Sequence, residues 1–415
     1  MIGAYLIFSL MLGGWTYVSQ PEQTIELLLA YAAYIGLTLV LGGLAWQVWY
    51  RPGKASCGIM IALTLSNVGA SIAYRMGTEA MTEFLLDLML MLLIFLVVYS
   101  VIRFTKLYSL RFLNLICMAA LPLVLIGARM TGTETNGSYL YFCGIMIFGI
   151  VLAGYPFVVA YFMKMPQNRY RGGDVSNLSW NLMGLLMYTF VLFGGCVICN
   201  EFGLLLILGL TSTIIFFIRC KNLVTKCAYS MVCIAGAGLA CIKISHINDR
   251  IQIWLNLENV GNNKALAAKA ESVLYLFRHF KRMGWWGNGL GNLPRSYYPT
   301  LNSDHVLVTL INDYSIFFAM LVLSLGILYV KWMLTEVPRQ NVYDRYLGLA
   351  SGLIVGFMLL IDVASALGSS ITAGIGFIWV SAGSAVNMML TVLLAVHAGV
   401  MERQEKRNVV LQKNT

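Results

Sequence analysis

Five acidic residues lie within or beside long apolar stretches of the sequence, where a charge is unfavourable and is often kept for function. They are Asp87, Glu201, Asp304, Asp313 and Asp362. Asp304 follows Asn302 and Ser303 and precedes His305 at the start of an apolar run. Its carboxylate could act as a general base, whereas the structural alternatives are a helix cap or a salt bridge. In a helix that starts at Asp304, Asp313 would lie on roughly the opposite face and about 13 Å deeper, so the spacing does not predict that they act as a pair.

Other patterns that support catalysis or metal binding do not occur in the sequence. The four histidines are scattered, and none has the spacing of a metal ligand. Neither a serine nucleophile elbow nor a Walker-type loop is found. Cys196 and Cys199 have CxxC spacing, but they lie in an apolar run, so we interpret them as packing residues. The spacing therefore predicts no metal ligands.

The composition predicts that membrane helices hold these side chains. Of 415 residues, 59% are hydrophobic and 11% are charged, compared with about 45–50% and about 25% in soluble domains. We therefore expect an all-α, polytopic membrane protein with about twelve transmembrane helices. The apolar runs that could span a bilayer are 3–19, 25–48, 57–74, 83–102, 112–128, 139–163, 177–199, 203–218, 227–245, 306–330, 346–368 and 375–400.

The distribution of the basic residues predicts the orientation in the membrane. With a cytoplasmic amino terminus, the inner loops and the tail contain 18 of the 28 Lys and Arg residues. The short outer loops contain only Arg75 and Arg129, and the rest lie in or beside one long outer loop, which the positive-inside rule does not count. Both termini should be cytoplasmic. The net charge of +10 is dispersed between apolar runs, so we expect no nucleic-acid partner.

The long outer segment, residues 246–305, should carry the chemistry because it is the largest polar part of the chain. Apolar residues recur at helical spacing in 263–283 and cationic residues lie elsewhere around the helix, which predicts an interfacial amphipathic helix. This helix could cap the membrane domain, or its cations could attract a lipid phosphate. Residues 284–291 contain four glycines, which predict tight turns, and Trp285 and Trp286 suit the headgroup zone.

Several segments in this part of the chain resemble the signature loop of the shape, elongation, division and sporulation family, the RodA and FtsW proteins. They are Arg250-Ile251, Trp254-Leu255-Asn256, residues 284–291, residues 302–307 and Asn312-Asp313. Members of this family are bacterial peptidoglycan glycosyltransferases. In them a Gly-x-Gly-x-Gly turn precedes a His-Thr-Asp-Phe-x-Phe motif with an essential aspartate. Asp304 matches that aspartate, and Asn302 stands in the place of the histidine.

The resemblance extends along most of the chain. Residues 200–203 resemble the family's Pro-Asp-Leu-Gly, residues 372–384 resemble its last outer loop, and Asp362 falls where the family usually has asparagine. The ten helices of the family match the third to twelfth apolar runs. The resemblance thus implies two extra helices in residues 1–56, a RodA/FtsW-like core in 57–405 that includes the extracytoplasmic loop 246–305, and a cytoplasmic tail in 406–415.

One part of the family's polar cavity is missing from this sequence. After Asn136-Gly137 the family normally has Gln-Pro-Ser-Glu and then a lysine, whereas residues 148–154 contain no ionisable side chain. Either Glu201, Asp362 or Arg129 replaces the lost groups, or the activity is reduced or redirected.

The resemblance implies an inverting enzyme that polymerises lipid II at the outer face of the bacterial cytoplasmic membrane, in elongation, division or sporulation. Asp304 would be the catalytic base, and loop cations or a divalent cation, Mg²⁺ or Mn²⁺, would stabilise the departing undecaprenyl pyrophosphate. A class B penicillin-binding protein is the expected partner. The expected substrate-binding residues are Glu201, Lys281, Arg282, Arg295, Asn302, Ser303, His305 and Asp362.

Alternative functions remain open. A non-catalytic scaffold for a penicillin-binding protein, or a flippase for a lipid-linked precursor, would explain the missing cavity residues. A flippase usually has an internal repeat, and none is evident in this sequence. A different lipid-linked polysaccharide polymerase or ligase would also have a large, basic outer loop.

Overall fold

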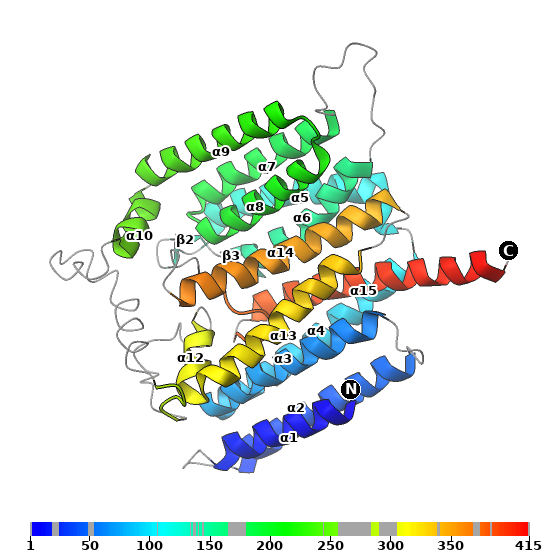
Figure 1. Cartoon of the computed structure of the whole chain (residues 1–415), viewed down its shortest axis with the longest axis vertical. Coiled ribbons are helices and arrows are strands. Elements are labelled where there is room, and N and C mark those ends of the chain that lie inside the picture. Colours follow the sequence, from blue (N-terminus) through cyan, green and yellow to red (C-terminus); the bar gives the residue numbers. More distant parts are fainter. Residues whose placement is uncertain are drawn as a thin grey trace.

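The computed structural model of the protein is a helical bundle (Figure 1). Short antiparallel strand pairs add to it: β1 (Glu134–Thr135) pairs with β2 (Ser138–Tyr139), and β3 (Tyr141–Phe142) pairs with β4 (Ile145–Met146). The residues that the structure describes are 2–18, 25–48, 54–105, 107–132, 134–135, 138–139, 141–142, 145–164, 180–243, 245–255, 284–289, 305–337, 341–367, 374–381 and 384–413.

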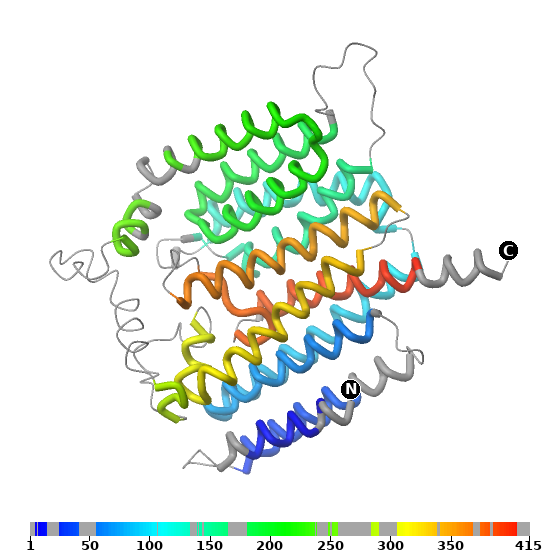
Figure 2. The backbone as a smooth tube through the Cα atoms, in the orientation of Figure 1, coloured from blue at the N-terminus to red at the C-terminus, as the bar shows by residue number. Residues whose placement is uncertain are grey.

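The long helices lie roughly side by side and cross the molecule in alternating directions (Figure 2). Their bounds, with those of the shorter helices, are α1 Ile2–Val18, α2 Ile25–Val48, α3 Lys54–Met76, α4 Thr78–Phe104, η1 Leu107–Ser109, α5 Arg111–Thr131, α6 Ile147–Lys164, α7 Trp180–Ile198, α8 Phe202–Arg219, α9 Leu223–Lys243, α10 Ser245–Leu255, α12 Val306–Asp313, α13 Ile316–Thr335, α14 Val342–Ala366 and α15 Ser384–Lys413.

The bundle has two ends that differ in their chain segments (Figure 1). We call the end that carries residues 284–289, α10, α12 and the β-strands the loop end. We call the opposite end, where η1 lies and α14 begins, the tail end. The segment 284–289 is named loop 284–289.

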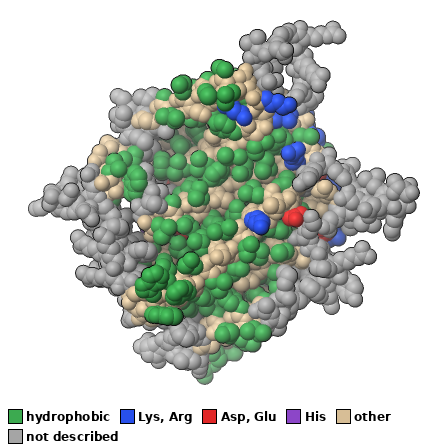
Figure 3. Space-filling view, viewed as in Figure 1, with side chains coloured by type: hydrophobic (Ala, Val, Ile, Leu, Met, Phe, Trp, Pro, Cys, Tyr) green, Lys and Arg blue, Asp and Glu red, His purple; other side chains and the backbone are tan. Residues whose placement is uncertain are grey.

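The helices have the length and composition of membrane helices. Each of the twelve predicted runs contains a helix. Hydrophobic side chains cover the face in Figure 3, and the Lys and Arg side chains on that face lie mostly toward the tail end. The prediction of a multi-pass helical membrane protein is confirmed. Among the described residues, nine helices are long and apolar enough to cross a membrane: Ala55–Met76, Thr78–Phe104, Arg111–Thr131, Ile147–Lys164, Asn181–Ile198, Phe202–Arg219, Ile316–Thr335, Val342–Ala366 and Ala385–Gln404.

The tenth predicted run, 306–330, is not one helix, so the expectation of a continuous span is wrong there. It is divided into α12 and α13 at Tyr314 and Ser315. The Ser315 hydroxyl oxygen accepts a hydrogen bond from the Phe318 N–H at 3.1 Å, as expected of a residue that caps a helix N-terminus. The break lets α12 lie at the loop end while α13 crosses the bundle (Figure 1).

The twelfth predicted run, 375–400, also begins differently, because residues 374–381 are not helical and α15 begins at Ser384. The segment is buried within protein, with Phe377 and Val380 fully covered. Such backbone is tolerated at membrane depth only where protein surrounds it. Gly69 of α3 permits its approach, since an added Cβ there would lie 2.9 Å from the Val380 carbonyl oxygen.

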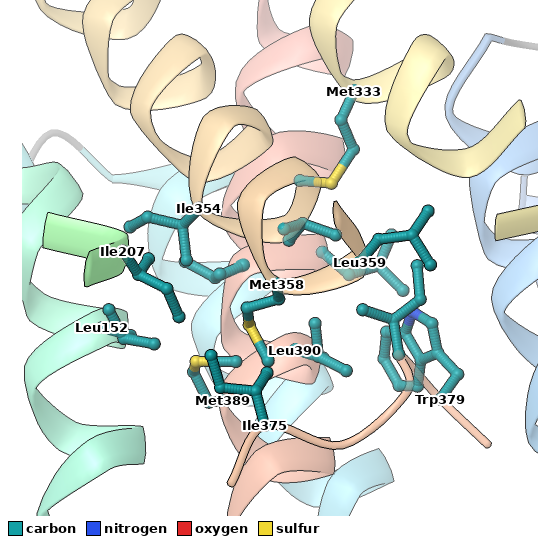
Figure 4. Packing of buried hydrophobic residues seen from close by; sticks show 14 of the residues in the cluster. Leu152, Ile207, Met333, Ile354, Met358, Leu359, Ile375, Trp379, Met389 and Leu390 are labelled. Carbon is teal, nitrogen blue, oxygen red and sulfur yellow. The ribbon is translucent and has the colours of Figure 1, made fainter. Parts of the chain in front are cut away.

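The apolar core lies where α6, α8, α14 and α15 meet. Met358 of α14 is fully buried there, with Leu152, Ile207 and Leu390 around it (Figure 4). These side chains come from four different helices, and their interdigitation fixes how the helices pack.

A buried polar cluster joins helices at the tail end, and we call it the tail cluster: Tyr108, Asn114, Tyr343, Asp344 and Arg403. The Tyr108 hydroxyl donates to the Asp344 carboxylate at 2.9 Å and accepts from the Arg403 guanidinium at 2.8 Å. The Tyr343 hydroxyl donates to the Asn114 side-chain oxygen at 2.8 Å. Burial, followed by the nearby Asp344 carboxylate, raises the pKa of Tyr108. Its hydroxyl therefore remains a donor at neutral pH.

Candidate functional site at the loop end

Loop 284–289 is held against the junction between α12 and α13 by hydrogen bonds. The Asn288 N–H donates to the Asn312 carbonyl oxygen at 2.7 Å. The side-chain amide of Asn288 donates to the side-chain oxygen of Asn312 at 3.0 Å. The Ile316 N–H donates to the Trp285 carbonyl oxygen at 3.2 Å. Both ends of this junction are thus bonded to the loop.

Gly287 is the point of closest approach between this loop and α12. Its φ of 73° lies in the left-handed region, which a side chain disfavours. A Cβ at this position would lie 2.6 Å from the Asn312 carbonyl oxygen and 2.7 Å from that of Ile311. The predicted tight turn is confirmed for loop 284–289, and the structure assigns Gly287 this close contact.

A buried ion pair supports the same junction from the side of α3. Arg75, in the last turn of α3, pairs with Asp313, the last residue of α12. Their side chains are 4% and 0% exposed, so loss of either partner would leave a buried charge without its counterion. The Asn312 side-chain amide donates to the Asp313 carboxylate at 2.9 Å. Hydrogen bonds therefore connect loop 284–289 to the ion pair through Asn312.

His305 and α12 form the buried start of the predicted catalytic segment. Every residue of α12 is buried, and His305 is 6% exposed. The His305 carbonyl oxygen accepts from the Val308 N–H at 3.0 Å. Asp304, the predicted catalytic residue, directly precedes His305 in the chain and lies outside the described residues. The structure thus fixes the segment that follows Asp304.

Glu201 lies at the turn between α7 and α8, elsewhere on the loop end. Asn200 has a φ of 59°, and the Glu201 N–H donates to the Cys196 carbonyl oxygen at 2.8 Å. This pattern is that of a Schellman helix end, with asparagine in its left-handed position. It places Glu201 at the first position before α8, where it is half-buried.

Arg129 approaches the same turn through strand β2. Its guanidinium carbon lies 4.1 Å from the centroid of the Tyr139 ring, within the range of a cation–π contact. The Tyr139 N–H donates to the Cys199 carbonyl oxygen at 3.0 Å. Arg129 and Glu201 therefore flank one turn at the loop end.

The other intramembrane carboxylates lie on separate helices. Asp362 is fully buried in α14 near the loop end, whereas Asp87 is half-buried on α4. Of the predicted site residues, the structure describes Glu201, His305 and Asp362, each on a different element. The remaining predicted residues, with the amphipathic helix predicted for 263–283, lie outside the described residues: Lys281, Arg282, Arg295, Asn302, Ser303 and Asp304.

A divalent cation needs a group of oxygen or nitrogen ligands. Within the described part of the chain, no group of three or more His, Cys, Asp or Glu residues could hold a metal ion. No chemical step is assigned to a metal.

Comparison with known sequences gives one partial match. No family model matches the sequence. A probable peptidoglycan glycosyltransferase FtsW from Tolumonas auensis is 28% identical over 144 residues, which cover 32% of this chain. The chain spans 37% of the length of that curated relative.

Comparison with solved structures gives matches over most of the chain. One chain, from a study of how a peptidoglycan synthase complex coordinates polymerization and crosslinking, has a TM-score of 0.63 and 13% identity. The match covers 83% of this chain and 97% of the other. RodA of Thermus thermophilus has a TM-score of 0.56 and 13% identity, over 84% of this chain and 96% of RodA. An Asp-to-Ala variant of that RodA has a TM-score of 0.57. The chain therefore has the fold of RodA, and about a third of its sequence is similar to FtsW.

Proposed function

We propose that the protein is a peptidoglycan glycosyltransferase that polymerises lipid II at the outer face of the cytoplasmic membrane, with inversion at the anomeric carbon. The observation that carries the proposal is the anchored loop end. There loop 284–289 and the ion pair of Arg75 and Asp313 hold the segment that begins directly after Asp304. The RodA fold and the partial FtsW match support the same conclusion.

In the proposed reaction, the Asp304 carboxylate takes the proton of the acceptor sugar's 4-hydroxyl. The oxygen forms a bond to the anomeric carbon of the donor, and the bond from that carbon to the pyrophosphate oxygen breaks. Undecaprenyl pyrophosphate leaves with the electron pair, and attack from the opposite face inverts the configuration. The proposed ligands of the pyrophosphate are the cations Lys281, Arg282 and Arg295, and those of the sugars are Glu201, Asn302, Ser303, His305 and Asp362.

We infer that the loop end faces the outside of the cell and that both termini face the cytoplasm. The 18 Lys and Arg residues of the predicted inner loops and tail support this orientation. A class B penicillin-binding protein is the proposed partner, supported by the matched structure in which polymerization and crosslinking are coordinated.

We propose further that α1 and α2 are additions to the family core of residues 57–405. The matched structures cover 83–84% of this chain but 96–97% of their own chains. The part of this chain that the matches leave uncovered is large enough to include residues 1–56.

The test is polymerisation of purified lipid II by the protein in lipid nanodiscs, with Asp304→Asn as the variant. We expect the wild type to form glycan polymer and Asp304→Asn to be slower by about 10²- to 10⁴-fold, the usual contribution of a general base. Asp249→Asn, which removes a carboxylate of α10 at the same end, is the matched control and should retain activity. Addition of EDTA, then of Mg²⁺ or Mn²⁺, tests the divalent cation. Undiminished polymer formation by Asp304→Asn would overturn the proposal.

A specific observation favours the scaffold alternative. Phe148, Val151 and Leu152 of α6 are buried and apolar. They lie in the stretch 148–154, which corresponds to the part of the family's cavity that normally carries ionisable side chains. A scaffold would bind its penicillin-binding protein equally well with Asp304→Asn and would form no polymer under conditions in which an active relative does. Polymer formation by the wild type alone excludes a purely scaffolding role.

A further inference from the structure

The α1–α2 hairpin is bonded to α3 through buried polar side chains. The Asn67 side-chain amide of α3 donates to the Ser9 hydroxyl of α1 at 2.5 Å, and both residues are fully buried. The Tyr34 hydroxyl of α2 is hydrogen-bonded to the Ser66 hydroxyl at 2.8 Å. The hairpin lies along α3 at the edge of the bundle (Figure 2), so α3 is enclosed between the hairpin and the rest of the protein.

One face of α3 connects the hairpin to the loop end. Asn67, Ser71 and Arg75 are spaced four residues apart, so they lie in a row along the helix. Asn67 binds α1, as described. The Tyr314 hydroxyl donates to the Ser71 hydroxyl at 3.1 Å. Arg75 then forms the buried ion pair with Asp313. Successive turns of α3 thus contact α1 and then the α12–α13 junction.

An aromatic contact provides a second connection from α1. Phe8 is stacked on Phe318 of α13, with ring centroids 6.4 Å apart and an interplanar angle of 4°. Phe318 also contacts Tyr314, with ring centroids 4.7 Å apart. Tyr314 directly follows Asp313, so α1 supports this junction from α13 as well as from α3.

We propose that the α1–α2 hairpin positions the loop-end site, with Phe8 and Ser9 as positioning residues that act through α3 and α13. The hairpin sets the place of Arg75 and Tyr314, and these hold Asp313, Asn312 and loop 284–289. Lipid provides no hydrophobic drive for helix association, so packing and interhelical hydrogen bonds decide where a membrane helix lies. The role in catalysis rests on the proposed function, whereas the positioning itself does not.

The test compares two double variants of the full chain in lipid nanodiscs. Phe8→Ala with Ser9→Ala removes the contacts to α13 and α3. Ile7→Ala with Met11→Ala is the matched control, because these side chains of α1 are 62% and 71% exposed. Hydrogen exchange is measured at the Asn288 amide, which is bonded to Asn312, and at amides in the middle of α14. Lipid II polymerisation gives kcat and KM for the same proteins.

We expect hydrogen exchange at the Asn288 amide to be about tenfold faster in the Phe8→Ala, Ser9→Ala protein, because loop 284–289 would open locally more often. Exchange at the amides of α14 should not change. kcat should fall by a similar factor with little change in KM, and the control should match the wild type. Phe8→Tyr with Ser9→Thr, which keeps the ring and the hydroxyl, should restore slow exchange. Asp313→Asn should also speed exchange, and its combination with the hairpin variant should be non-additive.

Unchanged exchange at Asn288, or equal acceleration in α14, would overturn the inference, because the hairpin would then not support the site specifically. Full additivity with Asp313→Asn would also count against it. If the wild type forms no polymer while the exchange pattern is as expected, the proposed function fails and the positioning role stands.

Discussion

Gly287 shows how one residue determines the contact between loop 284–289 and α12. Its positive φ and its contact with the Asn312 carbonyl both exclude a side chain. We expect Gly287→Ala to displace loop 284–289 and to lower the rate of lipid II polymerisation at least about tenfold, which corresponds to about 1.4 kcal/mol. Gly284→Ala is the control, because a Cβ at Gly284 would have no heavy atom within 4 Å. Equal losses in both variants would contradict this account.

At the residue scale, the sequence predicts the kinds of groups in the site better than their contacts. Four glycines in 284–291 predict tight turns, but only the position of the Asn312 carbonyl shows that Gly287 is the one in close contact. Arg75 and Asp313 are separated by 238 residues, 313 minus 75, so no local spacing could pair them. Only Asp313 indicated a partner by its type, since a charge inside an apolar run usually has one, whereas Arg75 was expected in a short outer loop.

The tail cluster connects elements that are far apart in the chain, and it should affect stability more than activity. Tyr108→Phe removes the donor to Asp344 and the acceptor for Arg403, both buried or half-buried. We expect a loss of about 1–3 kcal/mol in the free energy of unfolding, seen as a lower melting temperature in nanodiscs. Exchange at the Asn288 amide should not change.

Tyr141→Phe serves as the control, because Tyr141 is 41% exposed at the loop end. An unchanged melting temperature in Tyr108→Phe, or an equal decrease in Tyr141→Phe, would mean that the tail cluster does not stabilise the fold.

At the element scale, the long helices could be predicted because nearly continuous apolar runs leave few alternatives in a membrane. The break between α12 and α13 carried a local signal, since Ser315 is a typical helix-capping residue that follows Asn312 and Asp313. For the buried segment 374–381 the signal was the resemblance of residues 372–384 to the family's last outer loop. Its apolar side chains by themselves predicted a helix, and the surrounding protein, including Gly69, accommodates the non-helical backbone.

At the scale of the whole molecule, composition and length predict the class, a polytopic helical protein, but not the order in which helices pack. The contact of α1 and α2 with α3 depends on side chains such as Ser9, Asn67 and Tyr34. Each is an ordinary polar residue in an apolar run. Their pairing requires the three-dimensional arrangement, which a single sequence does not supply.

The orientation of the whole molecule decides which compartment the proposed site faces. Labelling of intact bacteria with a membrane-impermeant maleimide measures it, in a protein in which the exposed Cys57, Cys227 and Cys233 are changed to serine. We expect Gly284→Cys, at the loop end, to react in intact cells and Lys221→Cys, at the tail end, only after permeabilisation. The physical reason is that most of the Lys and Arg residues lie in the predicted inner loops and tail. The reverse pattern would place Asp304 on the cytoplasmic side, where it could not take part in polymerisation of lipid II at the outer face. That result would contradict both the proposed orientation and the proposed function.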